Sequence, residues 1–327
     1  MSLLKTMPPL ENPQIDTAIP EGKKPRTGIL TLGLLGVTAF VFAYTYMDTT
    51  TQIPTTQTAT VAQTDAYTNV SIKAKSAIVV DLRTGKTLYA KNADAQLPLA
   101  SLTKVAMALA VSDVLPLDTI VTIPYDTAPK GSAMRLAKGE QWRIGDIINF
   151  TLVASSNEGA NILAAAADSA VLAKYPDASP EAPTLWLMNS IARKLGLSNT
   201  YFLNVNGLDL STTQAGAYGS ARGMELLFAY AASTSPGIFT GTTKDGLLLT
   251  DESGNTTSAI NTNEALGQIP GLIMGKTGFT DLAGGNLGLV FDVGLAHPVV
   301  AIVLGSSREG RFVDMHTLLV ATRDFIM

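Results

Sequence analysis

Residues 284–305 read GGNLGLVFDVGLAHPVVAIVLG, which is two apolar runs separated by a short turn that contains Gly294. Such runs predict two adjacent strands. SAIVVD and KTLYA, at residues 76–81 and 86–90, predict a second hairpin far earlier in the chain. Between them, residues 101–232 carry apolar side chains mostly at helical spacing. Strands at both ends of a helical insert imply one α/β (α+β) domain whose termini meet in a single antiparallel sheet.

Composition excludes several classes of function. The 327 residues contain 23 Lys plus Arg and 27 Asp plus Glu, a net charge of -4, so no basic surplus would attract nucleic acid. The chain has no cysteine, which removes disulfides, thiolate nucleophiles and cysteine metal sites. With only two histidines, a multi-histidine metal site is excluded, and we expect neither a metal nor a cofactor.

The N-terminal region predicts a membrane anchor. Residues 27–47 carry no charge over a length that matches the ~20 residues of a spanning helix. Lysines and an arginine precede this segment, so we expect residues 1–26 to form a disordered cytoplasmic arm. Residues 48–70 are rich in Thr and Gln and predict a stalk, and residues 71–327 predict an exported domain on the periplasmic or cell-wall side. The alternative is a cleaved signal peptide, although the apolar run is longer than such peptides usually have.

The first chemical motif is Ser101-Leu102-Thr103-Lys104, which follows Pro98 and opens an apolar helix. Residues three apart share one helical face, so the hydroxyl and the amine lie side by side. A lysine in a dry site can lose its proton and act as the base that a serine nucleophile needs. The alternative is a helix-capping serine beside a solvated lysine, and Ser2-Leu3-Leu4-Lys5 matches the same spacing by chance.

The second motif is Ser155-Ser156-Asn157, on a tight turn between two predicted helices. A hydroxyl and an amide on such a turn can point into a cleft, where Ser155 would relay a proton and Asn157 would hold the lysine and the substrate. An ordinary helix-capping cluster is the alternative. Residues 253–255 repeat the pattern in a polar loop with no helix behind it.

The third motif is Lys276-Thr277-Gly278, within an apolar stretch that continues into the predicted strands. Lysine and threonine on an edge strand can together receive a substrate carboxylate. The glycine would let the backbone of a ligand approach closely, as an added strand. A phosphate-binding loop is disfavoured because the glycine upstream of such loops is missing.

Together, the three motifs resemble the signature set of penicillin-binding proteins and class A β-lactamases. The segments LPLASLTK, GSAMRLAKGE, SSNEGANILA, LGLSNTYFLNVNGLD, NTNEAL and MGKTGFTDLAGGNL are similar to those of the low-molecular-mass D-alanyl-D-alanine carboxypeptidases. The resemblance implies the penicillin-binding-protein/β-lactamase-like transpeptidase fold, an antiparallel sheet with a helical subdomain. It also implies the following roles: Ser101 as nucleophile, Lys104 as base, Ser155 and Asn157 as proton relay and substrate holder, Lys276, Thr277 and Gly278 as the carboxylate site, and the backbone N–H groups of Ser101 and Phe279 as the oxyanion hole.

Two further expectations concern individual side chains. Arg311 roughly matches an arginine near the carboxylate site of that family. We expect Lys104 to be largely neutral at rest, because burial and the charge of Lys276 both disfavour its ammonium form. The chain ends one helix after its last predicted strand, so we expect the N-terminal span, rather than a C-terminal anchor or a second β-rich domain, to hold it at the membrane.

The resemblance implies a serine-type D-Ala-D-Ala carboxypeptidase that trims peptidoglycan stem pentapeptides and is acylated by β-lactams. The first alternative is a D,D-endopeptidase, which runs the same reaction on peptide cross-links. A β-lactamase comes next, but the chain lacks the E-x-x-L-N loop between Asn157 and Lys276 and carries Ser156 where those enzymes usually have aspartate. A cell-wall-binding module without activity is the last alternative.

Overall fold

The computed structural model describes residues 66–128, 130, 132 and 134–326. The predicted arm and transmembrane segment, and most of the predicted stalk, lie outside the described residues. Among the helices that the structure describes, none is both long enough and apolar enough to cross a membrane. All described residues belong to one compact unit, Ala62–Met327.

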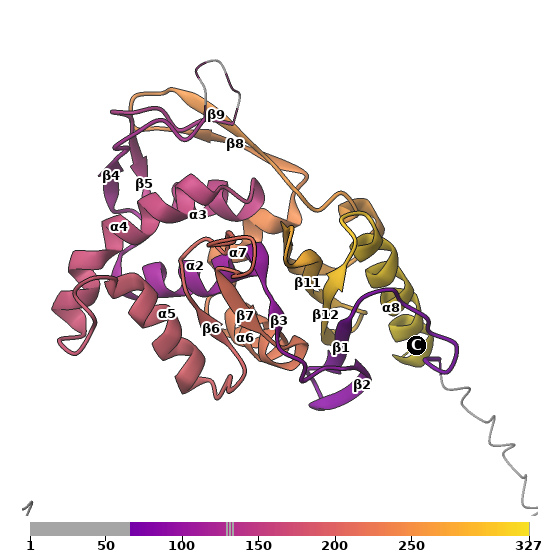
Figure 1. The fold of residues 1–327 in the computed structure, drawn as a ribbon. Coiled ribbons are helices and arrows are strands. Elements are labelled where there is room, and N and C mark those ends of the chain that lie inside the picture. Colours follow the sequence, from indigo (N-terminus) through magenta and orange to yellow (C-terminus); the bar gives the residue numbers. More distant parts are fainter. Residues whose placement is uncertain (1–65, 129, 131, 133, 327) are drawn as a thin grey trace, which may run out of the picture. The chain divides into compact units, whose positions relative to one another are not determined.

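A five-stranded antiparallel sheet forms the centre of this unit (Figure 1). Its order is β10-β11-β12-β1-β2, so the N-terminal hairpin pairs with strands from the C-terminal end, as the sequence predicted. Ser76 of β1 pairs with Leu304 of β12, and Asp81 pairs with Val299. The strands are β1 (Ser76–Asp81), β2 (Lys86–Lys91), β10 (Leu272–Thr280), β11 (Gly284–Asp292) and β12 (Pro298–Ser306).

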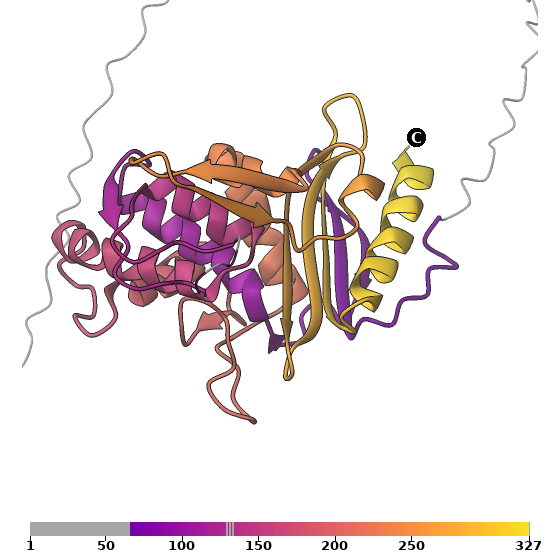
Figure 2. The ribbon, with the colours of Figure 1, turned by 90° about the horizontal axis from the view of Figure 1, so that it is seen from above.

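Both faces of the sheet are covered, which explains the near-continuous apolar runs of its central strands. Helix α8 (Gly310–Ile326) packs on one face, and the remaining helices pack on the other, as Figure 2 shows. Alternate residues of β11 face the two layers: Leu287 and Leu289 join the cluster under α8, whereas Val290 joins the larger cluster on the helical side. The architecture is therefore three-layered, with two cores separated by the sheet.

The helical layer is built around α2 (Thr103–Val114), in which every residue from 103 to 111 is buried. This central position explains why α2 is apolar all round rather than on one stripe. The helical structure that the sequence predicted over residues 101–232 is confirmed in this layer. The other helices of this layer are α3 (Ile144–Val153), α4 (Asn157–Lys174), α5 (Pro183–Lys194), α6 (Ala221–Thr234) and α7 (Pro236–Phe239), with short 3-10 turns η1 (Ala100–Leu102) and η2 (Thr240–Thr243). The 3-10 turn η3 (Leu266–Gln268) lies on the α8 side, because its neighbours Ala265 and Ile269 belong to the cluster under α8.

Three small sheets border the helical layer, and the sequence analysis did not predict them. Most of their strands have two or three residues, too few to show an alternating pattern. The strands are β3 (Leu97–Pro98), β6 (Tyr201–Phe202) and β7 (Ala217–Gly219) in one sheet, β4 (Ile120–Thr122) with β5 (Gln141–Arg143), and β8 (Gly246–Thr250) with β9 (Thr256–Ile260). The second S-x-N match, residues 253–255, lies in the β8–β9 turn.

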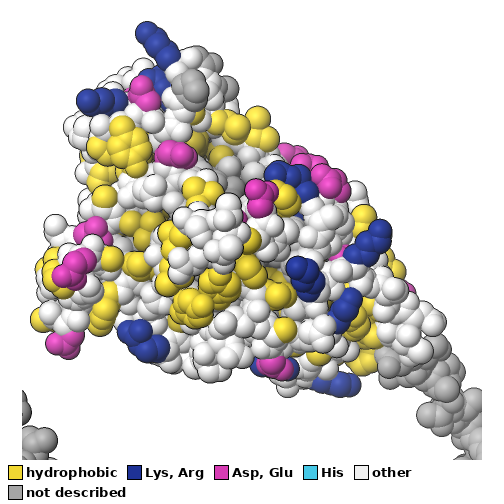
Figure 3. Space-filling model, in the orientation of Figure 1, with side chains coloured by type: hydrophobic (Ala, Val, Ile, Leu, Met, Phe, Trp, Pro, Cys, Tyr) yellow, Lys and Arg dark blue, Asp and Glu magenta, His cyan; other side chains and the backbone are white. Residues whose placement is uncertain are grey.

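The surface drawn in Figure 3 shows Lys and Arg side chains spread singly and interspersed with Asp and Glu. No continuous basic field covers the described residues on this face. Nucleic-acid binding relies on such a field, because phosphate neutralisation supplies most of its affinity.

Candidate active site

The Ser101 hydroxyl lies where β10 meets the start of α2. Ser101 is in the 3-10 turn η1 rather than in the first turn of an α-helix, and Ala100 before it has a left-handed φ of 48°. A residue with a side chain rarely adopts this conformation, and such local strain clusters at functional sites. The turn still places Lys104 three residues later on the same side, as predicted.

Lys104 is completely buried, and three groups surround its amine. Its Nζ lies 2.8 Å from Ser101 Oγ, 2.8 Å from Asn157 Oδ1 and 2.7 Å from the carbonyl oxygen of Asn206. A neutral amine can donate its two N–H bonds to the amide and carbonyl oxygens, which leaves its lone pair for the serine proton. The geometry therefore suits a base that serves Ser101.

Burial lowers the pKa of Lys104 to about 7, and the negative charge of Glu158 opposes this shift. The expectation of a largely neutral amine thus holds only above neutral pH, since at pH 7 about half of the population is protonated. The repulsion between Lys104 and Lys276 instead lowers the pKa of Lys276. Burial is the largest cause, the charges of Lys104 and Arg311 add to it, and together they hold this pKa well below its usual range.

The second motif occupies the turn between α3 and α4, as predicted, and its two serines have different partners. Ser156 caps α4, because its Oγ accepts a hydrogen bond of 3.0 Å from the Gly159 backbone N–H. Ser155 has a left-handed φ of 56°, and its Oγ accepts a hydrogen bond of 2.8 Å from Lys276 Nζ. The capping explanation therefore applies to Ser156, while Ser155 and Asn157 face the nucleophile region.

Lys276 lies on β10, an edge strand of the sheet, and its side chain is buried beside the cleft. The side chain is only 2% exposed, and Nζ donates to Ser155 Oγ and, over 2.9 Å, to the Thr277 carbonyl oxygen. The sequence analysis placed Lys276 and Thr277 together on the substrate carboxylate. In the structure Thr277 lines the cleft, and the amine of Lys276 contacts Ser155, another residue that lines it.

A cleft of about 200 Å³ brings the three motifs together. A larger cavity, of about 410 Å³, lies between α2, α5 and α6 and contains none of the predicted site residues, so size does not identify the site. The smaller cleft holds the nucleophile candidate, and no Asp or Glu lines it. Its lining residues are Ser101, Ser155, Asn157, Leu208, Thr262, Thr277, Gly278, Phe279, Arg308 and Arg311.

Gly278 lets β10 approach the backbone that carries the serine. A Cβ at this position would lie 3.0 Å from the Leu99 carbonyl oxygen and 3.2 Å from the Ser101 backbone nitrogen. The close approach that the sequence analysis assigned to a ligand is thus made by the chain itself. As a result, the amides of Ser101 and Phe279, the predicted oxyanion hole, belong to two segments in direct contact.

Arg311 comes from the first turn of α8 and is 5% exposed. Its Nη1 donates a 2.8 Å hydrogen bond to the Gly278 carbonyl oxygen, while its Nε has no hydrogen-bond partner among the described residues. Burial and the neighbouring Arg308 charge lower its pKa, against the opposite pull of Glu264 and Glu309. Arg311 therefore lines the cleft, where the resemblance implied an arginine near the carboxylate site.

Sequence reasoning missed three groups at this site. The Asn206 carbonyl binds Lys104, the Thr262 hydroxyl lies 2.5 Å from that of Thr277, and the Arg308 guanidinium lies 3.8 Å from the centre of the Phe279 ring. Asn206 lies within one of the segments that carried the resemblance. Thr262 lies within another of them, NTNEAL at residues 261–266, whereas Arg308 belongs to none, and only its position over Phe279 reveals it.

Comparison with known proteins identifies the family. The model of the D-alanyl-D-alanine carboxypeptidase family of peptidases matches residues 58–308. The chain belongs to this family. The family name agrees with the resemblance drawn from the three motifs and with a serine–lysine pair at the base of the cleft.

Two members and one structure illustrate the relationship within the carboxypeptidase family. D-alanyl-D-alanine carboxypeptidase DacF of Bacillus subtilis is 31% identical over 64% of this chain, which spans 51% of that relative's length. A D-alanyl-D-alanine endopeptidase of Pseudomonas aeruginosa is 34% identical over 41% of each chain. A penicillin-binding protein of Listeria monocytogenes, in its ampicillin-bound form, is 29% identical, with a TM-score of 0.64 over 77% of this chain and 98% of that one.

Proposed function

We propose that this protein is a serine-type D-Ala-D-Ala carboxypeptidase that removes the terminal D-Ala from peptidoglycan stem pentapeptides. The observation that carries the proposal is the buried Lys104 amine, 2.8 Å from Ser101 Oγ and with a pKa of about 7. A lysine with this pKa is a competent general base at neutral pH, and no histidine lines the cleft.

The reaction begins when neutral Lys104 accepts the Ser101 proton and Oγ attacks the carbonyl carbon between the two D-Ala residues. The Ser101 and Phe279 backbone N–H groups stabilise the negative charge on the tetrahedral intermediate. The proton that Lys104 took from Ser101 passes to the departing amine through Ser155, which is hydrogen-bonded to Lys276, so that Lys104 is neutral again and free D-Ala leaves. Water then hydrolyses the acyl-enzyme, with Lys104 again acting as base.

The terminal carboxylate of the substrate binds where the cleft is cationic. The Thr277 hydroxyl and the Arg311 guanidinium line this end, and no acidic side chain lines the cleft. Asn157, which already binds Lys104, also holds the amide of the substrate. The same groups would receive the carboxylate of a β-lactam, and the ampicillin-bound relative supports this extension.

The membrane assignment belongs to the same proposal. The charge-free residues 27–47, preceded by Lys23, Lys24 and Arg26, support a single span with the N-terminus in the cytoplasm. This orientation exports the domain to the side of the membrane on which peptidoglycan lies.

A D,D-endopeptidase is the second candidate, favoured by the Pseudomonas aeruginosa relative of that name. The two activities share every residue of the mechanism and differ in the leaving group. A β-lactamase is disfavoured, because no carboxylate lines the cleft to activate a deacylating water.

The test of the proposed function is Ser101→Ala, compared with Ser156→Ala as a matched control. We expect Ser101→Ala to lose labelling by a fluorescent penicillin and to reduce D-Ala release by about 10⁴- to 10⁶-fold. Ser156→Ala should keep both and lower the free energy of unfolding by about 0.5–2 kcal/mol through the lost helix cap. Labelling that persists in Ser101→Ala would refute the nucleophile.

Substrate choice separates the two candidates. A carboxypeptidase should release free D-Ala from a pentapeptide and should act poorly when the terminal carboxylate is amidated. An endopeptidase should instead favour cross-linked peptide dimers. Equal cleavage of free and amidated pentapeptides would contradict the carboxylate site.

A further inference from the structure

Arg308 is a cation at the cleft that the mechanism above does not use. It lies in the loop between β12 and α8, is exposed, and lines the same cleft as Ser101 and Thr277. Its one contact given by the structure is with the Phe279 ring, and no described residue forms an ion pair or a hydrogen bond with its guanidinium. The nearby acids Glu264 and Glu309 do not line the cleft.

The backbone holds Arg308 in this place. Gly285 of β11 pairs directly with Phe279 of β10, and a Cβ on Gly285 would lie 2.0 Å from the Ser307 carbonyl oxygen and 3.2 Å from the Arg308 backbone nitrogen. The loop therefore lies against the sheet beside Phe279. The guanidinium carbon is 3.8 Å from the centre of the Phe279 ring, a cation–π contact that orients the group without using its N–H donors.

The position of Arg308 along β10 indicates which part of a ligand it meets. In the proposed function, the terminal carboxylate binds at Thr277 and the scissile carbonyl at the Phe279 N–H. The substrate therefore runs along the strand from Thr277 towards Phe279, and its acyl part continues beyond Phe279. Thr277 and Phe279 are two residues apart in an extended strand, about 7 Å, which is too far for one carboxylate to bridge both positions.

We propose that Arg308 is a specificity-determining residue that binds a second carboxylate of the substrate, on the acyl side of the scissile bond. This inference rests on the proposed function. It specifies the substrate class as stem peptides whose residue before D-Ala-D-Ala carries a free side-chain carboxylate. The planar fork of an arginine suits such a group, which it can bind through two parallel hydrogen bonds.

The experiment compares two peptides that end in D-Ala-D-Ala and differ in one group. In the first, the preceding residue is diaminopimelic acid with a free side-chain carboxylate, and in the second this carboxylate is amidated. The measurement is kcat/KM for D-Ala release from each. We expect the full-length wild-type protein to prefer the acid about three- to fivefold, the range of an exposed ion pair, and to lose this preference as salt is added.

Three variants test whether Arg308 produces the preference. Arg308→Gln should bring the ratio of the two kcat/KM values to about one, and Arg308→Lys should keep part of it, because lysine retains the charge but not the fork. Arg83→Gln removes an exposed arginine at the far end of the sheet and should keep the wild-type ratio. Thermal unfolding of each variant checks that it folds.

The outcomes separate this inference from the proposed function. Release of D-Ala by the wild type without preference refutes the role of Arg308 alone. A ratio unchanged in Arg308→Gln, or an equal loss on both peptides, also refutes it, because Arg308 would then act on Phe279 or on the terminal carboxylate. No release from either peptide refutes the proposed function and this inference with it.

Discussion

Both ends of the central sheet carry ionisable side chains, but the two ends differ in the partners that these side chains have. At one end Lys104 and Lys276 are buried, and Arg311 lies nearby with its Nε unpartnered. At the other end, three to four residues or ~10–13 Å along the strands from the level of Lys276, lie the carboxylates of Asp81 and Asp292. Among the described residues, the first end holds basic side chains with no carboxylate in contact, and the second holds carboxylates that accept several hydrogen bonds.

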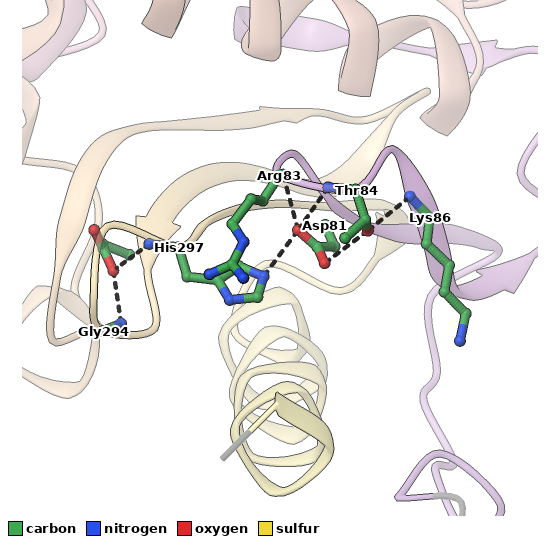
Figure 4. A network of polar contacts seen from close by, with 7 residues as sticks. Asp81, Arg83, Thr84, Lys86, Gly294 and His297 are labelled. Carbon is green, nitrogen blue, oxygen red and sulfur yellow. Dashed lines mark hydrogen bonds and ion pairs between the residues drawn. The ribbon is translucent and has the colours of Figure 1, made fainter. Parts of the chain in front are cut away.

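Figure 4 shows the hydrogen bonds that the carboxylates at the second end accept. Asp81 accepts hydrogen bonds of 2.8 Å from the Arg83 backbone N–H and 2.7 Å from the Thr84 hydroxyl, and its Oδ1 lies 2.9 Å from His297 Nε2. Burial raises the pKa of Asp81, but the Thr84 and Arg83 hydrogen bonds and the His297 contact outweigh this and lower it. Asp292 likewise accepts from the backbone N–H groups of Gly294 and His297.

This difference in partners distinguishes side chains that stabilise the fold from side chains that can take part in a reaction. Hydrogen bonds to a charged form stabilise that form, so the contacts of Asp81 hold this carboxylate ionised and contribute to folding. Buried amines without a carboxylate partner are instead pushed towards the neutral form, at a cost in stability. Perturbed groups of this kind cluster at functional sites, and the three predictions below test the contrast between the two ends.

The largest expected effect comes from Lys104→Arg at the cationic end. A guanidinium does not give up its proton, so the acylation rate by a fluorescent penicillin should fall by about 10²- to 10⁴-fold. Lys86→Arg, at the exposed β2 position near Asp81, is the matched control and should acylate like the wild type. Near-normal acylation of Lys104→Arg would contradict the base role and remove the contrast between the two ends.

The second effect is the pH dependence of acylation. The pKa of Lys104 is lowered to about 7, so its amine is neutral above that pH and becomes protonated below it. The acylation rate of the free enzyme should fall by about 50-fold between pH 7 and pH 5, with a slope that approaches tenfold per pH unit. His297→Gln should leave this acid limb in place, because His297 lies at the other end of the sheet. A flat profile, or a limb that moves in His297→Gln, would assign the titration to another group.

The smallest effect is on stability, from Asp81→Asn. We expect the free energy of unfolding at pH 7 to drop by about 1–2 kcal/mol through weakened charged hydrogen bonds, with kcat/KM unchanged. Because the folded pKa of Asp81 is lowered, its stabilisation is full above the unfolded value of about 3.9 and is lost as the pH falls through the folded value. Denaturant unfolding should therefore show wild type and variant converging below about pH 4. A variant that loses activity at unchanged stability would contradict the division between the ends.

The sequence analysis predicted the features that depend on neighbouring residues in the chain, and it missed features that depend on contacts between distant segments. The hairpin at 76–90 and the helices of the insert were predicted because period and turn residues are local signals. The small sheets were not predicted, since most of their strands are too short to show a pattern and β3 pairs with β7 over more than 100 residues. The motif around Ser155 shows the same limit: its turn was predicted, but only the structure distinguishes Ser156, which caps α4, from Ser155, which meets Lys276.

By itself, the sequence determined the elements of the main sheet and helical layer, the antiparallel meeting of both ends of the domain, and the pairing of Ser101 with Lys104 across one turn. Each depends on neighbours in the chain or on burying a long apolar run. The tertiary structure alone decided that Lys276 bonds to Ser155, 121 residues away, and that Arg308 lies over Phe279. These positions depend on how β10 packs against η1 and on how the β12–α8 loop meets Gly285, contacts between distant segments for which the local sequence carries no signal.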